Sequence, residues 1–329
     1  ELRQIAAADP GVSADLALIS TLLRRGDFDR ALAAIDGLEK KQPQLALANN
    51  LRGQVLLRRK DPAGARKNFE AALAKQPTLF SAVASLAALD LLEKKPEQAQ
   101  SRFDNLLKAD PKNSQALLAL AELKARTGGT PAEVLAQLNL AVLTNPDDAY
   151  SRIALINQHL SQKDYKAALV AAQGAVAALP EDFDLLGKLG QVLMANGDTN
   201  QAQITFQKMV SVQPRSIPGL LGLADTQLAA KDEEAAARTV KKALDIAPDS
   251  TAVQRAFIML AARQKRYGEA LPVARRMQAA RSNDALGWLL EGEVALVQQK
   301  WDAAATAFRS ATSKANPGQS PARLHFALL

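Results

Sequence analysis

A proline recurs along this chain at an almost constant interval. Eight prolines are spaced by 33, 34, 34, 35, 34, 34 and 34 residues: Pro10, Pro43, Pro77, Pro111, Pro146, Pro180, Pro214 and Pro248. The next step falls on Ser282, and the series resumes at Pro317. Because proline cannot continue a helix and biases its predecessor away from helical geometry, each one predicts the end of a helix. A fixed period of this length indicates a repeat architecture rather than two or three globular domains.

The composition is typical of closely packed helices. The 329 residues are 48% hydrophobic but only 4% aromatic, so alanine and leucine supply most of the apolar surface. Cysteine is absent, which excludes a disulfide framework, a thiolate metal site and a cysteine nucleophile. No apolar run approaches the ~18 residues that a bilayer-spanning helix needs.

Each interval between prolines shows the pattern of two helices joined by a turn. About twelve residues before a proline stands a small residue, with apolar residues four and seven positions later, as in Ala65, Phe69 and Ala72. Small residues at helical spacing allow two helix backbones to approach closely. The turns carry N-cap residues followed by proline, as in Asp61-Pro62 and Thr130-Pro131. The pattern therefore predicts tandem helix-turn-helix units.

The unit has glycine in its first helix (Gly53, Gly190, Gly292), alanine in its second and proline at its end, and it resembles the tetratricopeptide repeat. The resemblance implies an all-α fold, a right-handed α-solenoid of 34-residue helix-turn-helix repeats. We expect nine tandem repeats over residues 12–319, the end of a preceding repeat at 1–11 and the start of a tenth at 320–329. The chain is thus expected to be a fragment of a longer repeat protein. The proline stops argue against a long coiled coil.

Motifs for catalysis are missing from the sequence. It contains no Gly-x-Gly-x-x-Gly, Walker loop, His-Glu-x-x-His or Gly-x-Ser-x-Gly pattern. The only two histidines, His159 and His325, fall in distant repeats, so they are not expected to share a metal. Acidic pairs such as Asp147-Asp148 lie at predicted helix starts, where they complement the helix dipole. We therefore expect no catalytic residue, metal or cofactor, and no enzyme activity.

In tetratricopeptide repeat proteins the first helices line a concave groove, so the resemblance implies which side chains face a partner. Asparagine, glutamine, arginine and tyrosine side chains can hold an extended peptide segment. The expected groove residues are Asn50, Gln54, Arg58, Glu122, Arg126, Tyr150, Asn157, Asp184, Gln191, Asp225, Arg255, Arg263 and Glu293. They predict a scaffold that binds proteins or peptides.

Basic side chains give the alternative function. The formal net charge is +7, and clusters run from Arg52 to Lys67 and from Arg255 to Arg281. Such clusters can attract acidic partners, phosphates or a membrane surface. A repeat-type nucleic-acid binder would need a continuous basic stripe with stacking aromatics. We favour solvated helix faces and expect no nucleic-acid partner.

A narrower resemblance concerns the Ala/Leu-rich repeats and three motifs. They are the Gly128-Gly129-Thr130-Pro131 turn leading to Leu138-Asn139-Leu140-Ala141, the Asn145-Pro146 pair, and Arg323-Leu324-His325-Phe326-Ala327. These resemble the long tetratricopeptide lipoproteins, the PrsT family, encoded beside exosortase and exopolysaccharide genes in Gram-negative bacteria. The resemblance implies a periplasmic, outer-membrane-associated scaffold in polysaccharide or PEP-CTERM protein export, with any membrane anchor outside this fragment. A cytoplasmic tetratricopeptide adaptor is the alternative.

Overall fold

The computed structural model describes residues 11–314, and the regular structure in that range is helical throughout. The helices alternate between a first and a second member of successive pairs. The first helices are α2 (Ser13–Arg24), α4 (Ala46–Arg58), α6 (Phe80–Leu92), α8 (Ser114–Arg126), α10 (Ala149–Ser161), α12 (Phe183–Ala195), α14 (Ile217–Ala229), α16 (Thr251–Arg263) and α18 (Leu286–Val297). The second helices are α3 (Phe28–Lys41), α5 (Pro62–Lys75), α7 (Pro96–Ala109), α9 (Pro131–Thr144), α11 (Tyr165–Ala178), α13 (Thr199–Val212), α15 (Glu233–Ile246), α17 (Tyr267–Ala280) and α19 (Trp301–Lys314).

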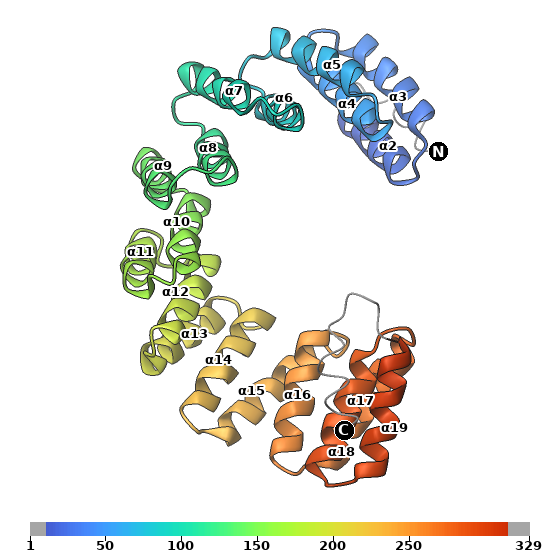
Figure 1. The fold of residues 1–329 in the computed structure, drawn as a ribbon, viewed down its shortest axis with the longest axis vertical. Helices are drawn as coiled ribbons and strands as arrows, with labels where there is room; N and C mark the ends of the chain where they lie inside the picture. The colour runs from blue at the N-terminus through green and yellow to red at the C-terminus, as the bar shows by residue number, and fades with distance from the viewer. Residues whose placement is uncertain (1–10, 315–329) are drawn as a thin grey trace. The chain divides into compact units, whose positions relative to one another are not determined.

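The chain divides into two compact units, residues 1–155 and 156–329, with the boundary inside α10. From α2 to α9 and again from α11 to α19, every helix packs against the next one along the chain (Figure 1). The recurrent prolines lie in the turns that lead into the first helices; Pro43, for example, stands three residues before Ala46. This confirms the predicted all-α solenoid of helix pairs. The segments predicted as partial repeats at 1–11 and 320–329, and His325, lie almost wholly outside the described residues.

Three positions on every second helix build the core. They hold the small residue, the apolar residue four positions later and the one three positions beyond, and all are buried in all nine pairs. The middle position, which we call the floor position, varies most in size. It is occupied by Ile35, Phe69, Phe103, Leu138, Ala172, Phe206, Val240, Ala274 and Phe308. The sequence pattern thus identified the buried stripe of each second helix.

Glycines of the first helices make room for the rings at the floor position. A Cβ placed on Gly53 would lie 2.6 Å from the ring of Phe69, and one on Gly292 would lie 2.5 Å from that of Phe308. Such distances are below van der Waals contact, so only a glycine lets the ring approach the backbone this closely. The glycine and the ring form one packing unit that is repeated along the chain.

A buried carboxylate ties three successive helices of the N-terminal unit together. Asp90 on α6 is fully buried and accepts hydrogen bonds from Arg66 on α5 and Arg102 on α7. The Arg66 Nη1 to Asp90 Oδ1 distance is 2.8 Å, and Arg66 Nη2 also lies 2.8 Å from Glu93 Oε1. Burial by itself raises the pKa of Asp90, but the two arginines outweigh it and hold that pKa below its usual value.

The turn within every pair contains one residue with positive φ. Glycine fills this position at Gly26, Gly128 and Gly197, whereas the other six pairs use a residue with a side chain: Lys60, Lys94, Lys163, Lys231, Lys265 and Gln299. The left-handed conformation ends a helix, and it costs a non-glycine residue roughly 1–2 kcal/mol. The six side chains therefore hold a strained backbone.

We expect Lys231→Gly, where φ is 64°, to raise the free energy of unfolding by about 1 kcal/mol, because glycine adopts this conformation without strain. Chemical denaturation of the intact chain measures the change. Lys231→Ala is the control, since alanine removes the charge but keeps the Cβ. Equal stabilisation by both substitutions would assign the effect to charge and contradict the strain.

Pro272 falls inside α17, which continues as one helix from Tyr267 to Ala280. No helix in the described range is both long and apolar enough to cross a bilayer.

Candidate binding groove on the first helices

Depressions lie between successive first helices, and in two of the three a residue of the intervening second helix contributes to the lining. The α14–α16 pocket has a volume of about 260 Å³ and is lined by Leu221, Ala224, Asp225, Leu228, Val240, Ala256, Met259, Leu260 and Arg263. The α16–α18 pocket has a volume of about 390 Å³ and is lined by Ile258, Met259, Ala262, Arg263, Leu290, Glu293, Val294 and Val297. The two share Met259 and Arg263, so they form a continuous surface, here called the C-terminal groove.

The N-terminal unit has a corresponding pocket between α6 and α8, with a volume of about 180 Å³. Its lining occupies the same helical positions as that of the α14–α16 pocket, four repeats earlier. Arg126 corresponds to Arg263, Glu122 to Met259, and Phe103 to Val240. Equivalent positions of the repeat therefore form both pockets.

The volumes of the three pockets increase as the residue at the floor position becomes smaller. Phe103 fills the α6–α8 pocket, and the smaller Val240 leaves more space beneath the α14–α16 pocket. On α17 the floor position is Ala274, which does not reach the α16–α18 pocket, and that pocket is the larger of the two in the C-terminal groove. The volume rises from phenylalanine through valine to alanine.

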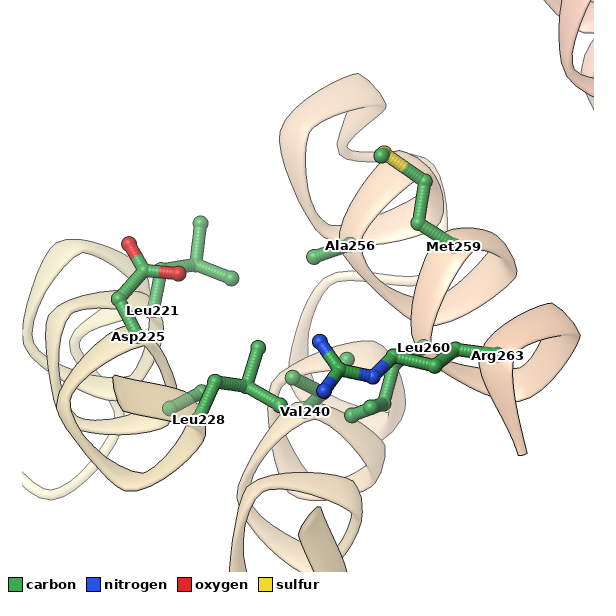
Figure 2. A pocket seen from close by; sticks show the side chains of 9 residues that line it. Leu221, Asp225, Leu228, Val240, Ala256, Met259, Leu260 and Arg263 are labelled. Atoms are coloured by element: carbon green, nitrogen blue, oxygen red, sulfur yellow. The ribbon is translucent and has the colours of Figure 1, made fainter. Parts of the chain in front are cut away.

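Charged side chains surround the apolar lining of the C-terminal groove. Figure 2 shows Asp225 on α14 and Met259 on α16 on facing helices, with the Arg263 side chain extending over the pocket toward α15. The Arg263 Nη2 lies 2.7 Å from Glu233 Oε1 on α15. Loss of hydration against the surrounding protein raises the pKa of Asp225 above its usual value. The groove thus combines apolar pockets with a few charged side chains at their borders, a common arrangement in binding sites.

Five of the predicted groove residues line the pockets, and a sixth, Arg255, lies near them in sequence. Asp225, Arg263 and Glu293 belong to the C-terminal groove, and Arg255 precedes Met259 by one turn on α16. Glu122 and Arg126 line the α6–α8 pocket, where their side chains form an ion pair of 3.6 Å.

The remaining predicted groove residues lie outside these pockets. Asn50 is only 4% exposed, and its Oδ1 has no hydrogen-bond partner, so in this structure it is not open to a partner. Gln54 is half-buried, and Arg58 is exposed with its Nη1 3.5 Å from the Leu23 carbonyl oxygen. Four more are exposed on the first helices α10 and α12: Tyr150, Asn157, Asp184 and Gln191.

Many basic side chains of the two clusters form ion pairs with acidic side chains of neighbouring helices and turns. In the first, Arg52 bonds Asp36 and Glu39, and Arg59 bonds Asp29. In the second, four arginines bond to acidic or carbonyl groups: Arg263 to Glu233, Arg275 to Glu291, Arg276 to Asp249 Oδ1, and Arg281 to the Asp249 carbonyl oxygen. These cations stabilise contacts between helices and do not form a free basic stripe.

Sequence reasoning missed the apolar half of the groove. It selected polar side chains on the first helices and passed over Leu221, Leu228, Met259 and Val297. Met259 and Val297 are about half exposed, at 50% and 53%, although they sit on helices whose apolar residues otherwise face the core. An apolar residue at an inward position was the available signal. Within residues 11–314, no three His, Asp or Glu side chains gather as a metal site.

Comparisons with known proteins agree with this architecture. Two family models, both described as tetratricopeptide repeat, match the chain; one covers residues 16–79 and 255–321, and the other covers 90–155 and 159–218. Together the matches extend over most of the sequence. No curated protein matches the chain.

Several solved structures are similar at low sequence identity. A crystal structure of MamA is 23% identical, covers 50% of this chain and 90% of its own, and has a TM-score of 0.41. A tetratricopeptide repeat protein from Parabacteroides merdae is 15% identical, with 75% and 97% covered and a TM-score of 0.43. YrrB, described as a TPR protein with an unusual peptide-binding site, is 20% identical, with 60% and 97% covered and a TM-score of 0.41. From its helix pairs, its buried repeat positions and the family models, the chain belongs to the tetratricopeptide repeat proteins.

Proposed function

We propose that this protein is a non-enzymatic scaffold that binds a protein or peptide partner in the C-terminal groove. The observation that carries the proposal is the pair of adjoining pockets between α14, α16 and α18, which are apolar inside and bordered by charged side chains. Exposed apolar surface with a polar rim is typical of interaction sites. Tetratricopeptide repeat proteins act in general as scaffolds rather than catalysts, which favours the same reading.

The proposal extends to the cell envelope. The resemblance to the PrsT-type lipoproteins supports a periplasmic, outer-membrane-associated scaffold in exopolysaccharide or PEP-CTERM protein export. A cytoplasmic adaptor would use the same groove on different partners, so identifying the partner decides between the two.

The second candidate function is nucleic-acid binding, and it rests on a basic depression. Arg215, Arg238, Lys241 and Lys242 surround an open space of about 570 Å³ beside α15, with Asp245 as the acidic member. Binding of nucleic acid there would fall steeply as salt is added, because phosphate contacts release counterions.

We expect a charged residue in the apolar lining to abolish partner capture. The test is a cross-linked pull-down from envelope fractions of the native host, comparing wild type with Met259→Glu/Val297→Glu. The matched control is Val170→Glu/Ile204→Glu, which places the same charges on second helices at side chains of similar or greater exposure, 71% and 58%.

Export or envelope proteins that are captured by wild type and by the control, but lost with the groove variant, would support the proposal. Equal capture by all three chains would place the partner site elsewhere and contradict it. Salt-sensitive capture of nucleic acid that depends on Arg238 and Lys242 would favour the second candidate function.

A further inference from the structure

The C-terminal groove contains two carboxylates without a partner. Within the described part of the chain, neither Asp225 on α14 nor Glu293 on α18 has a hydrogen bond or ion pair. Both border apolar lining; Asp225 is exposed and Glu293 is half-buried, and partial loss of hydration raises the pKa of Asp225. An unpaired carboxylate at the border of an apolar pocket can accept a charge-assisted hydrogen bond from a cation that docks there.

The two arginines of α16 do not neutralise these carboxylates. Arg263 is already bonded to Glu233 at 2.7 Å, and Coulombic attraction by Arg263 does not contribute to the pKa of Asp225. Arg255 is exposed and lies outside the lining of both pockets. The two unpaired carboxylates of the groove thus stand at its α14 and α18 borders, and Arg263 between them is paired with Glu233.

The spacing of the first helices sets the spacing of a ligand's side chains. Neighbouring packed helices are about 8–10 Å apart. A peptide in the extended polyproline II conformation advances about 3.1 Å per residue with three residues per turn, so its residues three positions apart point to the same side. Side chains that enter the α14–α16 and α16–α18 pockets therefore come from residues about three positions apart. The outer borders, Asp225 and Glu293, are about two helix spacings apart, which corresponds to about five residues.

We infer that the C-terminal groove binds an extended peptide segment in which two apolar side chains, three residues apart, are flanked on both outer sides by basic side chains. This inference rests on the proposed function and names the partner class for the same groove. The apolar side chains enter the two pockets, the basic ones meet Asp225 and Glu293, and the polar stretch between them crosses α16. The pattern is nearly symmetric, so both chain directions satisfy it.

The probe for this inference is a synthetic ten-residue peptide with the core Lys-Leu-Ser-Ser-Leu-Lys between Gly-Ser ends and a fluorescent label. Two matched peptides replace both lysines with glutamate or with glutamine. Fluorescence anisotropy with the intact chain gives the dissociation constants. We expect the lysine peptide to bind about tenfold more tightly than the glutamine peptide, and more tightly still than the glutamate peptide.

Two kinds of variant assign the preference to the carboxylates and the pockets. Asp225→Asn/Glu293→Gln is expected to bring the lysine and glutamine peptides to equal affinity without lowering the thermal midpoint, because neither carboxylate has a hydrogen bond or ion pair to lose within the described part of the chain. Val240→Phe copies the floor residue of the α6–α8 pocket, and it is expected to weaken all three peptides by filling the α14–α16 pocket.

Equal binding of the lysine and glutamate peptides by wild type would overturn the inference, as would a lysine preference that survives Asp225→Asn/Glu293→Gln. If Met259→Glu/Val297→Glu still abolishes partner capture, the proposed scaffold function stands without this ligand class. Absence of binding by every peptide also overturns the inference. If, in addition, Met259→Glu/Val297→Glu still captures the partner proteins, the proposed scaffold function of the groove is overturned too.

Discussion

Replacing Asp90 with alanine is expected to lower the free energy of unfolding by about 3–5 kcal/mol, because the substitution leaves the guanidinium groups of Arg66 and Arg102 without their shared carboxylate. Asp90 is fully buried and joins α5, α6 and α7, so its loss weakens two helix contacts together. Urea denaturation followed by circular dichroism measures the change. Hydrogen exchange should show the opening within the N-terminal unit, since repeats are stabilised mainly by their neighbours.

Asp36→Ala is the matched control. Asp36 also bonds an arginine, with 2.6 Å between its Oδ1 and Arg52 Nη2, but 60% of its side chain is exposed. Exposed ion pairs contribute between nothing and about 1 kcal/mol. Losses of the same size at Asp36 and Asp90 would show that burial does not set the importance of these pairs.

The contribution of Asp90 depends on pH in a direction that its lowered pKa determines. In the folded chain the pKa of this carboxyl lies below the usual aspartate pKa of about 3.9, so the group stays charged at a more acidic pH. Its stabilisation is therefore complete above the unfolded-state pKa and is lost as the pH falls through the lower folded-state pKa. The difference in unfolding free energy between wild type and Asp90→Asn should be largest near neutral pH and shrink in acid. A difference that does not change with pH would contradict the role of the charge.

Truncating Phe206 should also have a large effect. Its ring fills the space above two glycines, Gly190 in its own pair and Gly222 in the next; a Cβ at these positions would lie 2.5 and 2.4 Å from the ring. Phe206→Ala is expected to cost about 3–5 kcal/mol through lost burial and the cavity that remains. Denaturant titration of the intact chain gives the value.

A second substitution makes this prediction specific. Gly222→Ala should destabilise the wild-type chain because its methyl group meets the ring, yet it should stabilise the Phe206→Ala chain by about 1 kcal/mol through helix propensity. Gly174→Ala, where a Cβ meets nothing within 4 Å, is the control and should stabilise both backgrounds. The same sign for Gly222→Ala in both backgrounds would disprove the packing of ring against glycine.

The fold was predictable because its information is local and repeated. The proline interval, the N-caps such as Asp61 and the small residues such as Ala65 recur with helical spacing, so errors at one repeat are corrected by the others. The buried glycine and ring contacts follow from the same pattern. Asp90 could not be identified in this way, since its two arginines come from different helices and lie 24 and 12 residues away.

The groove was only half predictable. Polar residues at inward positions, such as Asp225 and Glu293, were found because the helical register determines which face they occupy. Pocket depth depends on a side chain of another helix, and no pattern in α14 or α16 reports the size of Val240. The burial of Asn50 likewise results from the packing of neighbouring helices, and its position in the helical register does not reveal that packing.

The variation at the floor position separates the depth of a depression from the identity of the exposed residues around it. A phenylalanine such as Phe103 or a valine such as Val240 supports the same helix pair, yet the two leave different depths beneath the exposed face. One buried side chain can thus make a depression deeper or shallower while the exposed residues around it stay unchanged. Among the nine helix pairs that the structure describes, this position already holds five different apolar residue types, so the depth of a depression can change while the exposed face above it keeps its sequence.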